Sequence, residues 1–309
     1  MSTATHVPET SLQEGDEPEA DDAWRTLRGC GLAFPVEAFR RFRYADGFSH
    51  SRALGLQICL AAVPLVVALV GLAGSIPGED VGEVLQAVVV GLTPGVSQEL
   101  VTATLDMPPT SGARVALWIG LASALVVLAT AMAQVERGAN RIYGIERDRP
   151  FLQRYARASV MAVAAGLPTL AGFLLLVGSS PAGDAVEDVY GLPDEVVAAV
   201  AVPVGALLLV ASVTAMLRHA PRRVQPGWSW LALGGLLVLV LWSALTAGVV
   251  EYVEASSSFT TVYGPLAVVV ALLLWGQLTS VAIYLGIAVA AQLEAVRAGV
   301  EHGARSDVA

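Results

Sequence analysis

Long apolar runs alternate with short polar segments along most of this chain. Six runs are about 20 residues or longer and carry no charge near their centres, and an α-helix needs this length to cross the hydrocarbon core of a bilayer. The runs cover residues 54–73, 115–134, 159–177, 196–217, 228–250 and 266–292. The pattern therefore predicts an all-α integral membrane protein with six transmembrane helices.

The segment 82–105 does not fit this pattern as clearly. Its apolar residues form a run too short to cross a bilayer, and Gly91, Pro94 and Gly95 interrupt it. We expect an outer-surface helical hairpin between the first and second spans. If this segment crossed the membrane, the arginine-rich segment 136–157 would lie opposite the basic amino-terminal flank, against the positive-inside rule.

Composition supports a membrane protein, and the charge distribution orients it. Of the 309 residues, 55% are hydrophobic and 15% charged, whereas soluble domains have about a quarter of their residues charged. The net charge of -9 averages over two different sides of the membrane. Of the eighteen arginines, Arg114 alone falls outside the segments expected in the cytoplasm. We therefore expect a bacterial cytoplasmic-membrane protein with both termini inside.

Four regions follow from these patterns. Residues 1–23 are expected to be a disordered acidic cytoplasmic tail, and residues 298–309 a second cytoplasmic tail. Residues 54–297 form the six-helix membrane domain. Residues 24–53 read as a basic amphipathic interfacial segment, with Arg40, Arg41 and Arg43 directed towards anionic lipid head groups. The alternative is a basic flank that only fixes orientation.

The segment 136–157 concentrates six arginines against three acids. Because the planar guanidinium grips phosphate oxygens in two places, we expect an anionic lipid head group to meet a cluster of four arginines. These are Arg137, Arg141, Arg149 and Arg218. Glu136 and Glu146 would pair with the arginines and hold the loop. Tyr143 and Gly144 would form a turn, with the tyrosine at the membrane interface. The alternative is an orientation signal with loop-ordering ion pairs.

Polar residues inside the spans are uncharged. Gln57 and Gln277 are candidate contacts for an amphipathic ligand in a weakly polar cavity, although hydrogen bonding between helices or back to their own carbonyls is the simpler explanation. The lack of ionisable residues at the span centres argues against a proton-coupled or sodium-coupled pump. Pro64 should kink the first span. Trp228 and Trp230 are expected in the interfacial belt, and Trp275 in the bundle.

Three motifs resemble the YihY/BrkB family of bacterial inner-membrane proteins, once labelled ribonuclease BN-like. They are the run 138–154, the run 217–227, and a Tyr-Gly pair that leads into the last span. The residues that carry the resemblance, or that we expect to shape these motifs, are Pro64, Glu136, Asn140, Tyr143, Gly144, Glu146, Pro221, Pro226, Tyr263, Gly264, Trp275 and Gly286. One departure is that Ile287 and Ala288 follow Gly286, where the family often has an acid soon afterwards. If that acid has a role, this protein either lacks it or takes it from Glu294.

The resemblance implies functions without fixing one. The family includes serum-resistance and virulence-associated factors, and some members are linked to envelope lipid traffic. We do not expect an enzyme, because the four histidines are dispersed and no cytoplasmic segment is long enough for a catalytic domain. We expect no cofactor, metal site or nucleic-acid partner, and membrane lipids as ligands. The expected function is a transporter or flippase-like handler of an amphipathic envelope component. The alternative is a non-transporting scaffold that recruits envelope or cytoplasmic partners through its basic loops.

Overall fold

The computed structural model describes residues 5–8, 20–73, 87, 90, 111–178, 186, 193–255, 266–299 and 305–306. The expected hairpin at 82–105, apart from two isolated positions, lies outside these residues. The Tyr263 and Gly264 pair also lies outside them.

Six long apolar helical segments dominate the fold, as the hydrophobic runs predict. They are α3 (Gly47–Ala73), α6 (Ser111–Ile142), α7 with α8 (Phe151–Ala164 and Gly166–Val177), α10 (Asp194–His219), α11 (Trp228–Ala255) and α13 (Ala267–Arg297). Each is long and apolar enough to cross a membrane. The protein is therefore an all-helical, multi-pass membrane protein.

Several helices extend beyond the apolar runs that predict them. Helix α3 begins at Gly47, before the expected start at residue 54, and α6 continues to Ile142. The expected loop at 136–157 is therefore wrong in its bounds, because only residues 143–150 between α6 and α7 are not helical. Hydrophobicity marks the part of a helix suited to lipid, but the backbone hydrogen bonds continue into polar sequence. Glu136 and Asn140 consequently lie on a helix.

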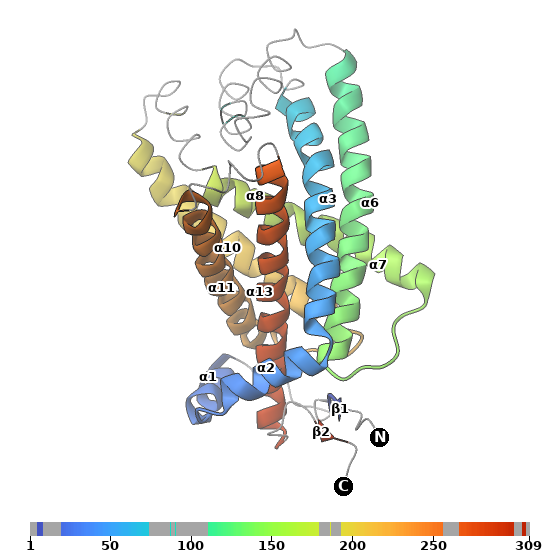
Figure 1. Ribbon diagram of the computed structural model, residues 1–309, viewed down its shortest axis with the longest axis vertical. Coiled ribbons are helices and arrows are strands. Elements are labelled where there is room, and N and C mark those ends of the chain that lie inside the picture. Colours follow the sequence, from blue (N-terminus) through green and yellow to red (C-terminus); the bar gives the residue numbers. More distant parts are fainter. Residues whose placement is uncertain are drawn as a thin grey trace.

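Two short helices precede the first span. Helix α1 (Ala20–Gly29) and helix α2 (Phe34–Tyr44) lie across the end of the bundle where both chain termini are found (Figure 1). Near them, strand β1 (Thr5–His6) pairs antiparallel with strand β2 (Arg305–Ser306). Residues 5–6 and the start of α1 are thus ordered inside the tail that was expected to be disordered.

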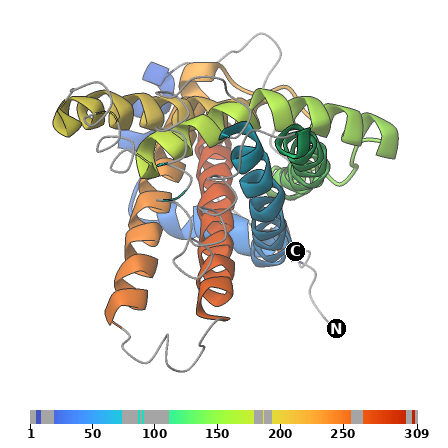
Figure 2. The same cartoon turned by 90° about the horizontal axis from the view of Figure 1, so that it is seen from above.

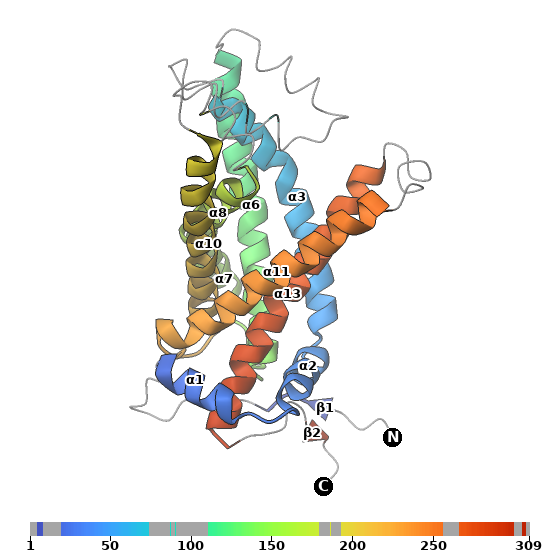
Figure 3. The same ribbon diagram turned by 90° about the vertical axis from the view of Figure 1, so that its left-hand side faces the viewer.

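The long helices pack as antiparallel neighbours (Figures 1 and 3). Helix α3 lies along α6 and α13, α11 lies along α13, and α10 packs against α8 and α11. Helices α7, α8 and α10 run along one side of the group formed by α3, α11 and α13 (Figure 2). Pro64 lies inside α3 and Pro203 inside α10, and each helix continues through its proline.

Glycines set the closest helix crossings. A Cβ on Gly172 of α8 would lie 2.8 Å from the carbonyl oxygen of Gly205 on α10, and a Cβ on Gly205 would lie 2.9 Å from the carbonyl oxygen of Gly172. Gly55 of α3 similarly meets Gly276 and Gln277 of α13. Small residues let helix backbones approach in this way in membranes.

The buried core lies towards the end of the bundle that carries α1 and α2. It includes Phe42, Ile142, Leu217, Trp230 and Tyr284. Trp230 is 1% exposed, so the expectation that it belongs to an interfacial belt is wrong. The outward faces of the helices instead expose large apolar side chains such as Leu60, Trp118 and Leu207, as a surface in contact with lipid tails would.

Candidate functional site

All arginines except Arg114 lie at one end of the bundle, which we call the arginine end. There α6, α10 and α13 finish at Ile142, His219 and Arg297, while α7 and α11 begin (Figure 1). Arg114 lies near the start of α6, at the opposite end. Because consecutive spans are antiparallel, the two connecting loops 143–150 and 220–227 meet at the arginine end.

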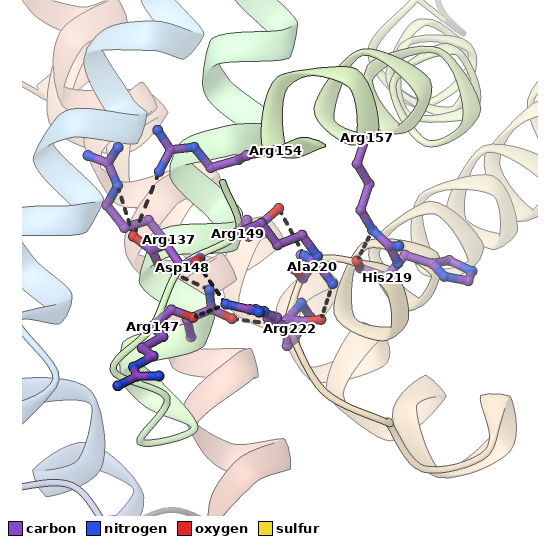
Figure 4. Close-up of polar contacts among 12 residues, drawn as sticks. Arg137, Arg147, Asp148, Arg149, Arg154, Arg157, His219, Ala220 and Arg222 are labelled. Carbon is purple, nitrogen blue, oxygen red and sulfur yellow. Dashed lines mark hydrogen bonds and ion pairs between the residues drawn. The ribbon is translucent and has the colours of Figure 1, made fainter. Parts of the chain in front are cut away.

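A buried ion pair anchors the first of these loops. Arg149 Nη1 lies 3.0 Å from Glu136 Oε2, and the Glu136 side chain is 2% exposed. The same guanidinium donates to the carbonyl oxygens of Ala220 and Pro221 at 3.1 Å each, as Figure 4 shows for Ala220. The expected pairing of Glu136 with an arginine is present. The fork of Arg149 is therefore occupied by the protein itself.

Asn140 links both loops from the last turn of α6. Its Nδ2 donates to Asp148 Oδ1 at 3.0 Å, and its Oδ1 accepts from the backbone N–H of Arg222 at 2.7 Å. Its side chain is fully buried. The carboxamide offers a donor and an acceptor side by side, so one side chain bonds to both loops. Arg222, which lies in the second loop, also donates from Nη1 to the carbonyl oxygen of Asp148 at 2.9 Å (Figure 4).

Looser contacts surround this linkage. Asp148 Oδ2 lies 3.8 Å from Arg137 Nε and 3.7 Å from Arg154 Nη1 (Figure 4). Arg157 Nε donates to the carbonyl oxygen of His219 at 3.0 Å. The Arg137 side chain keeps 43% of its surface exposed, whereas that of Arg154 is mostly covered. Arg137 and Arg154 thus hold the first loop through Asp148, and Arg157 joins α7 to the end of α10.

The other expected site residues are of two kinds: those whose side chains already bond to the protein, and those that are exposed. Arg218 Nη1 donates to the carbonyl oxygen of Pro226 at 2.8 Å, and its guanidinium lies 5.3 Å from the centre of the Trp228 ring. Arg141 is exposed. Glu146 is exposed and forms no ion pair among the described residues, so its expected role in holding the loop is wrong. Pro221 and Pro226 contribute their carbonyl oxygens to the held arginines.

Tyr143 and Gly144 form the expected turn, and Gly144 has the positive φ of 79° that favours glycine. Tyr143, however, is 1% exposed and does not anchor at an interface. The guanidinium of Arg223 lies 4.7 Å from the centre of its ring. Burial raises the pKa of the Tyr143 phenol, with the Glu294 carboxylate adding to the effect. The ring is packed as part of the core.

A second buried polar cluster surrounds the end of α13, and hydropathy alone does not reveal it. Arg41 is fully buried, donating from Nε to Gln292 Oε1 at 2.9 Å and from Nη1 to the carbonyl oxygen of Ile142 at 3.2 Å. Burial lowers the pKa of Arg41 to about 10. Arg41 therefore does not face lipid head groups, unlike the expectation. Nearby, Glu294 pairs with Arg223. In the sequence, this cluster is indicated by two polar residues, Gln292 and Glu294, close to the end of an apolar run.

The glutamines of the spans lie on facing helices. Gln57 of α3 is half-buried with its Oε1 unbonded among the described residues, and Gln277 of α13 abuts Gly55 through its backbone. Trp275 packs in the bundle as expected, and its Nε1 donates to Thr246 Oγ1 at 3.1 Å. A Cβ on Gly286 would clash with Val238 of α11 at 2.1 Å. Trp275 and Gly286 thus serve contacts between helices.

At the arginine end, buried contacts fix the backbone of the two loops, while some arginine side chains remain exposed. The loops are cross-linked by Glu136, Asn140 and Arg149, while Arg141 and Arg147 remain exposed. Within the described part of the chain, no three His, Cys, Asp or Glu side chains lie close enough to hold a metal ion. The arrangement can present guanidinium groups to an anion without first ordering the loops.

Sequence comparisons relate the chain to a family of bacterial membrane proteins. The chain is 24% identical over 266 residues to the putative ribonuclease-like protein YfkH of Bacillus subtilis, which covers 82% of this chain and 93% of YfkH. It is 27% identical over 270 residues to a UPF0761 membrane protein of Azoarcus sp. strain BH72, and 28% identical over 256 residues to one of Teredinibacter turnerae.

The matches cover 84% and 82% of this chain but span 64% and 58% of those two longer relatives. No solved structure matches significantly. The sequence profile described as Virulence factor BrkB matches residues 38–308, which include every helix of the bundle and both loops of the arginine end. The chain therefore belongs to the BrkB virulence-factor family.

Proposed function

We propose that this protein binds an anionic amphipathic component of the bacterial envelope at its arginine end and moves it within or across the membrane. The arginine end faces the cytoplasm in this proposal, since positively charged loops are retained there. The observation that carries the proposal is a loop pair cross-linked by buried contacts beside arginines that remain exposed. No catalytic chemistry is invoked.

The contacts refine which arginines would meet a head group. Arg149 and Arg218 already donate to carbonyl oxygens of the 220–227 loop, so they hold the site in shape. Arg137 and Arg141, together with Arg147, are open enough to reach a phosphate. Acyl chains require only uncharged walls, so this ligand class needs no ionisable residue within the spans.

Lipid retention and redistribution test the proposal directly. The protein would be purified from vesicles that contain phosphatidylglycerol, and its lipid movement measured after reconstitution. We expect Arg141→Gln with Arg147→Gln to retain several-fold less anionic lipid than the wild type. Arg25→Gln with Arg28→Gln is the matched control, because both arginines are exposed on α1 and belong to neither loop. Equal retention in all three proteins would disprove the role of the open arginines.

A scaffold is the second candidate function. The cross-linking of both loops through Asn140 and Arg222 favours it, because a fixed polar surface lowers the entropy lost when a protein partner binds. Redistribution of lipid by the wild-type protein distinguishes the candidates. If reconstituted wild type moves no lipid in any mixture, while a partner bound at the loops is lost in the Arg141→Gln and Arg147→Gln variant, the scaffold is correct.

A further inference from the structure

A second basic surface lies where α2 meets α3, apart from the two loops. We call it the α2–α3 corner and define it by Phe39, Arg40, Arg43, Phe48 and Arg52. The two phenylalanines are 44% and 41% exposed, and their ring centres lie 6.2 Å apart. The three arginines are exposed around them. Apolar rings beside guanidinium groups are typical of helices that lie in a membrane interface.

The buried face of α2 fixes the corner to the bundle. Phe42 is fully buried, and its ring centre lies 4.8 Å from that of Phe48. Arg41, on the covered side of α2, donates to Gln292 of α13. The opposite face of α2 is packed into the core, so the exposed rings are held in a fixed position. A surface fixed in this way loses little conformational freedom on binding.

The exposed face of α3 places the corner beside the hydrocarbon. Phe48 and Arg52 begin a line of exposed residues that continues through Leu56, Leu60 and Val63. The spacing of four, four, four and three residues keeps them on one side of the helix. Leu56, Leu60 and Val63 suit lipid tails. Arg52 consequently falls at the level of the phosphates and Phe48 just beyond it, at the interface.

The charges of the corner favour an anionic lipid over a neutral one. Arg40 Nη1 is paired with Glu37 at 2.8 Å, and Asp46 is an exposed acid beside the turn. Arg43 lies against the Tyr44 ring, at 6.0 Å from its centre, with its guanidinium still exposed. Arg52 donates from Nε to the carbonyl oxygen of Phe48 at 3.3 Å, and the residue is exposed. Arg43 and Arg52 are thus the cations open to a phosphate.

We propose that the α2–α3 corner binds anionic phospholipid in the leaflet next to the arginine end. Phe39 and Phe48 lie in the head-group region of the interface, while Arg43 and Arg52 bind the phosphate. The site is separate from the loops 143–150 and 220–227, and it does not depend on whether the protein moves lipid. Its occupant is a lipid in the bilayer, because the exposed rings adjoin the lipid-facing side of α3.

Spin-label depth measurements test the position of the corner. In full-length protein with Cys30→Ala and Cys59→Ala, single labels would replace Phe39, Leu56 and Val224 in vesicles of phosphatidylcholine and phosphatidylglycerol. We expect the ratio of oxygen to nickel-chelate accessibility to be highest at Leu56, intermediate at Phe39 and lowest at Val224, which is 76% exposed in the 220–227 loop. Water-like accessibility at both Phe39 and Val224 would overturn the proposal. A label at Phe39 that is protected from both reagents would mean that a protein segment covers the corner, which also overturns it.

Lipid selectivity tests the arginines. In the variant Arg43→Gln with Arg52→Gln, the excess of phosphatidylglycerol over phosphatidylcholine per protein should fall to about one third of the wild-type value or less, since each arginine near an anionic surface favours binding severalfold. Arg25→Gln with Arg28→Gln is the matched control and should keep the wild-type excess, because both arginines are exposed on α1 and belong neither to the corner nor to the loops. All variants should unfold at the wild-type temperature. An unchanged excess in the Arg43 and Arg52 variant rejects the corner. A drop confined to the Arg141 and Arg147 variant rejects it while sparing the proposed function.

Discussion

At the scale of single residues, the arginine end depends on side chains that would look ordinary in a list of polar residues. Asn140 bonds to both loops, and Glu136 neutralises a guanidinium that also binds two carbonyl oxygens. The sequence predicts a pairing partner for Glu136, but not for Asn140. Charge can be matched along the chain, whereas a contact between residues 140 and 222 depends on where two helices end.

Removing the charge of Glu136 on α6 should destabilise the protein more than removing the charge of the exposed Glu146 in the 143–150 loop. In Glu136→Gln, Arg149 keeps its carbonyl acceptors but loses its buried counter-ion, at about 3 kcal/mol of unfolding free energy, the lower end for a broken buried pair. Glu146→Gln is the control, because Glu146 is exposed. Unfolding in mixed detergent micelles measures both, and equal stabilities would contradict a buried pair.

Asn140→Asp should be harmful although it changes one atom of the side chain. The new carboxylate oxygen would face Asp148 Oδ1, now 3.0 Å from the donating Nδ2, so a hydrogen bond becomes a like-charge contact. We expect a loss of about 2–4 kcal/mol near neutral pH. The loss should shrink as pH falls and the carboxyls take up protons. A variant as stable as the wild type at pH 7 would show that the link between the loops is not formed.

At the scale of helices, hydrophobic runs locate the spans but not their ends. Helices α3 and α6 continue past the apolar sequence at the arginine end, because polar residues there are satisfied by neighbouring loops and helices. Arg41 shows the same limit. The alternation of aromatic and basic residues in α2 predicts an amphipathic helix, yet only the packing on α13 shows that Arg41 is on the buried side.

Glycine positions provide an element-scale prediction. Gly172→Ala should weaken the α8–α10 contact, since the new Cβ would lie 2.8 Å from the carbonyl oxygen of Gly205, a backbone atom that cannot rotate away. We expect a loss of about 1–3 kcal/mol, typical of overpacking. Gly248→Ala on α11 is the control, as its Cβ would meet nothing within 4 Å. Thermal unfolding of both variants should show a lower midpoint for Gly172→Ala alone.

At the scale of the whole molecule, six spans and the family follow from sequence, while the arrangement of the helices does not. Neighbouring helices such as α3 and α13 are far apart in the chain, and apolar faces alike in composition do not specify which of them pair. The close contacts at Gly55, Gly276 and Gly286 determine which helices pack together. The 138–154 and 217–227 runs, which carry the resemblance, contain the two joined loops.

Orientation is testable with two single cysteines in a background that lacks Cys30 and Cys59. Val224→Cys lies in an exposed loop of the arginine end, and Glu195→Cys at the exposed start of α10 at the opposite end. Since basic loops remain in the cytoplasm, an impermeant thiol reagent should label position 195 in intact cells and position 224 only after permeabilisation. The reverse pattern would invert the orientation.

The pairing of β1 with β2 bears on how many times the chain crosses the bilayer. Thr5 lies opposite Ser306, and His6 opposite Arg305, so the two ends of the chain meet on one side of the bundle. A chain whose ends touch in this way traverses a bilayer an even number of times, whichever side faces the cytoplasm. Halves of a split fluorescent protein fused to the two termini should therefore assemble within a single molecule. Their signal per molecule should be independent of how much protein the cell makes.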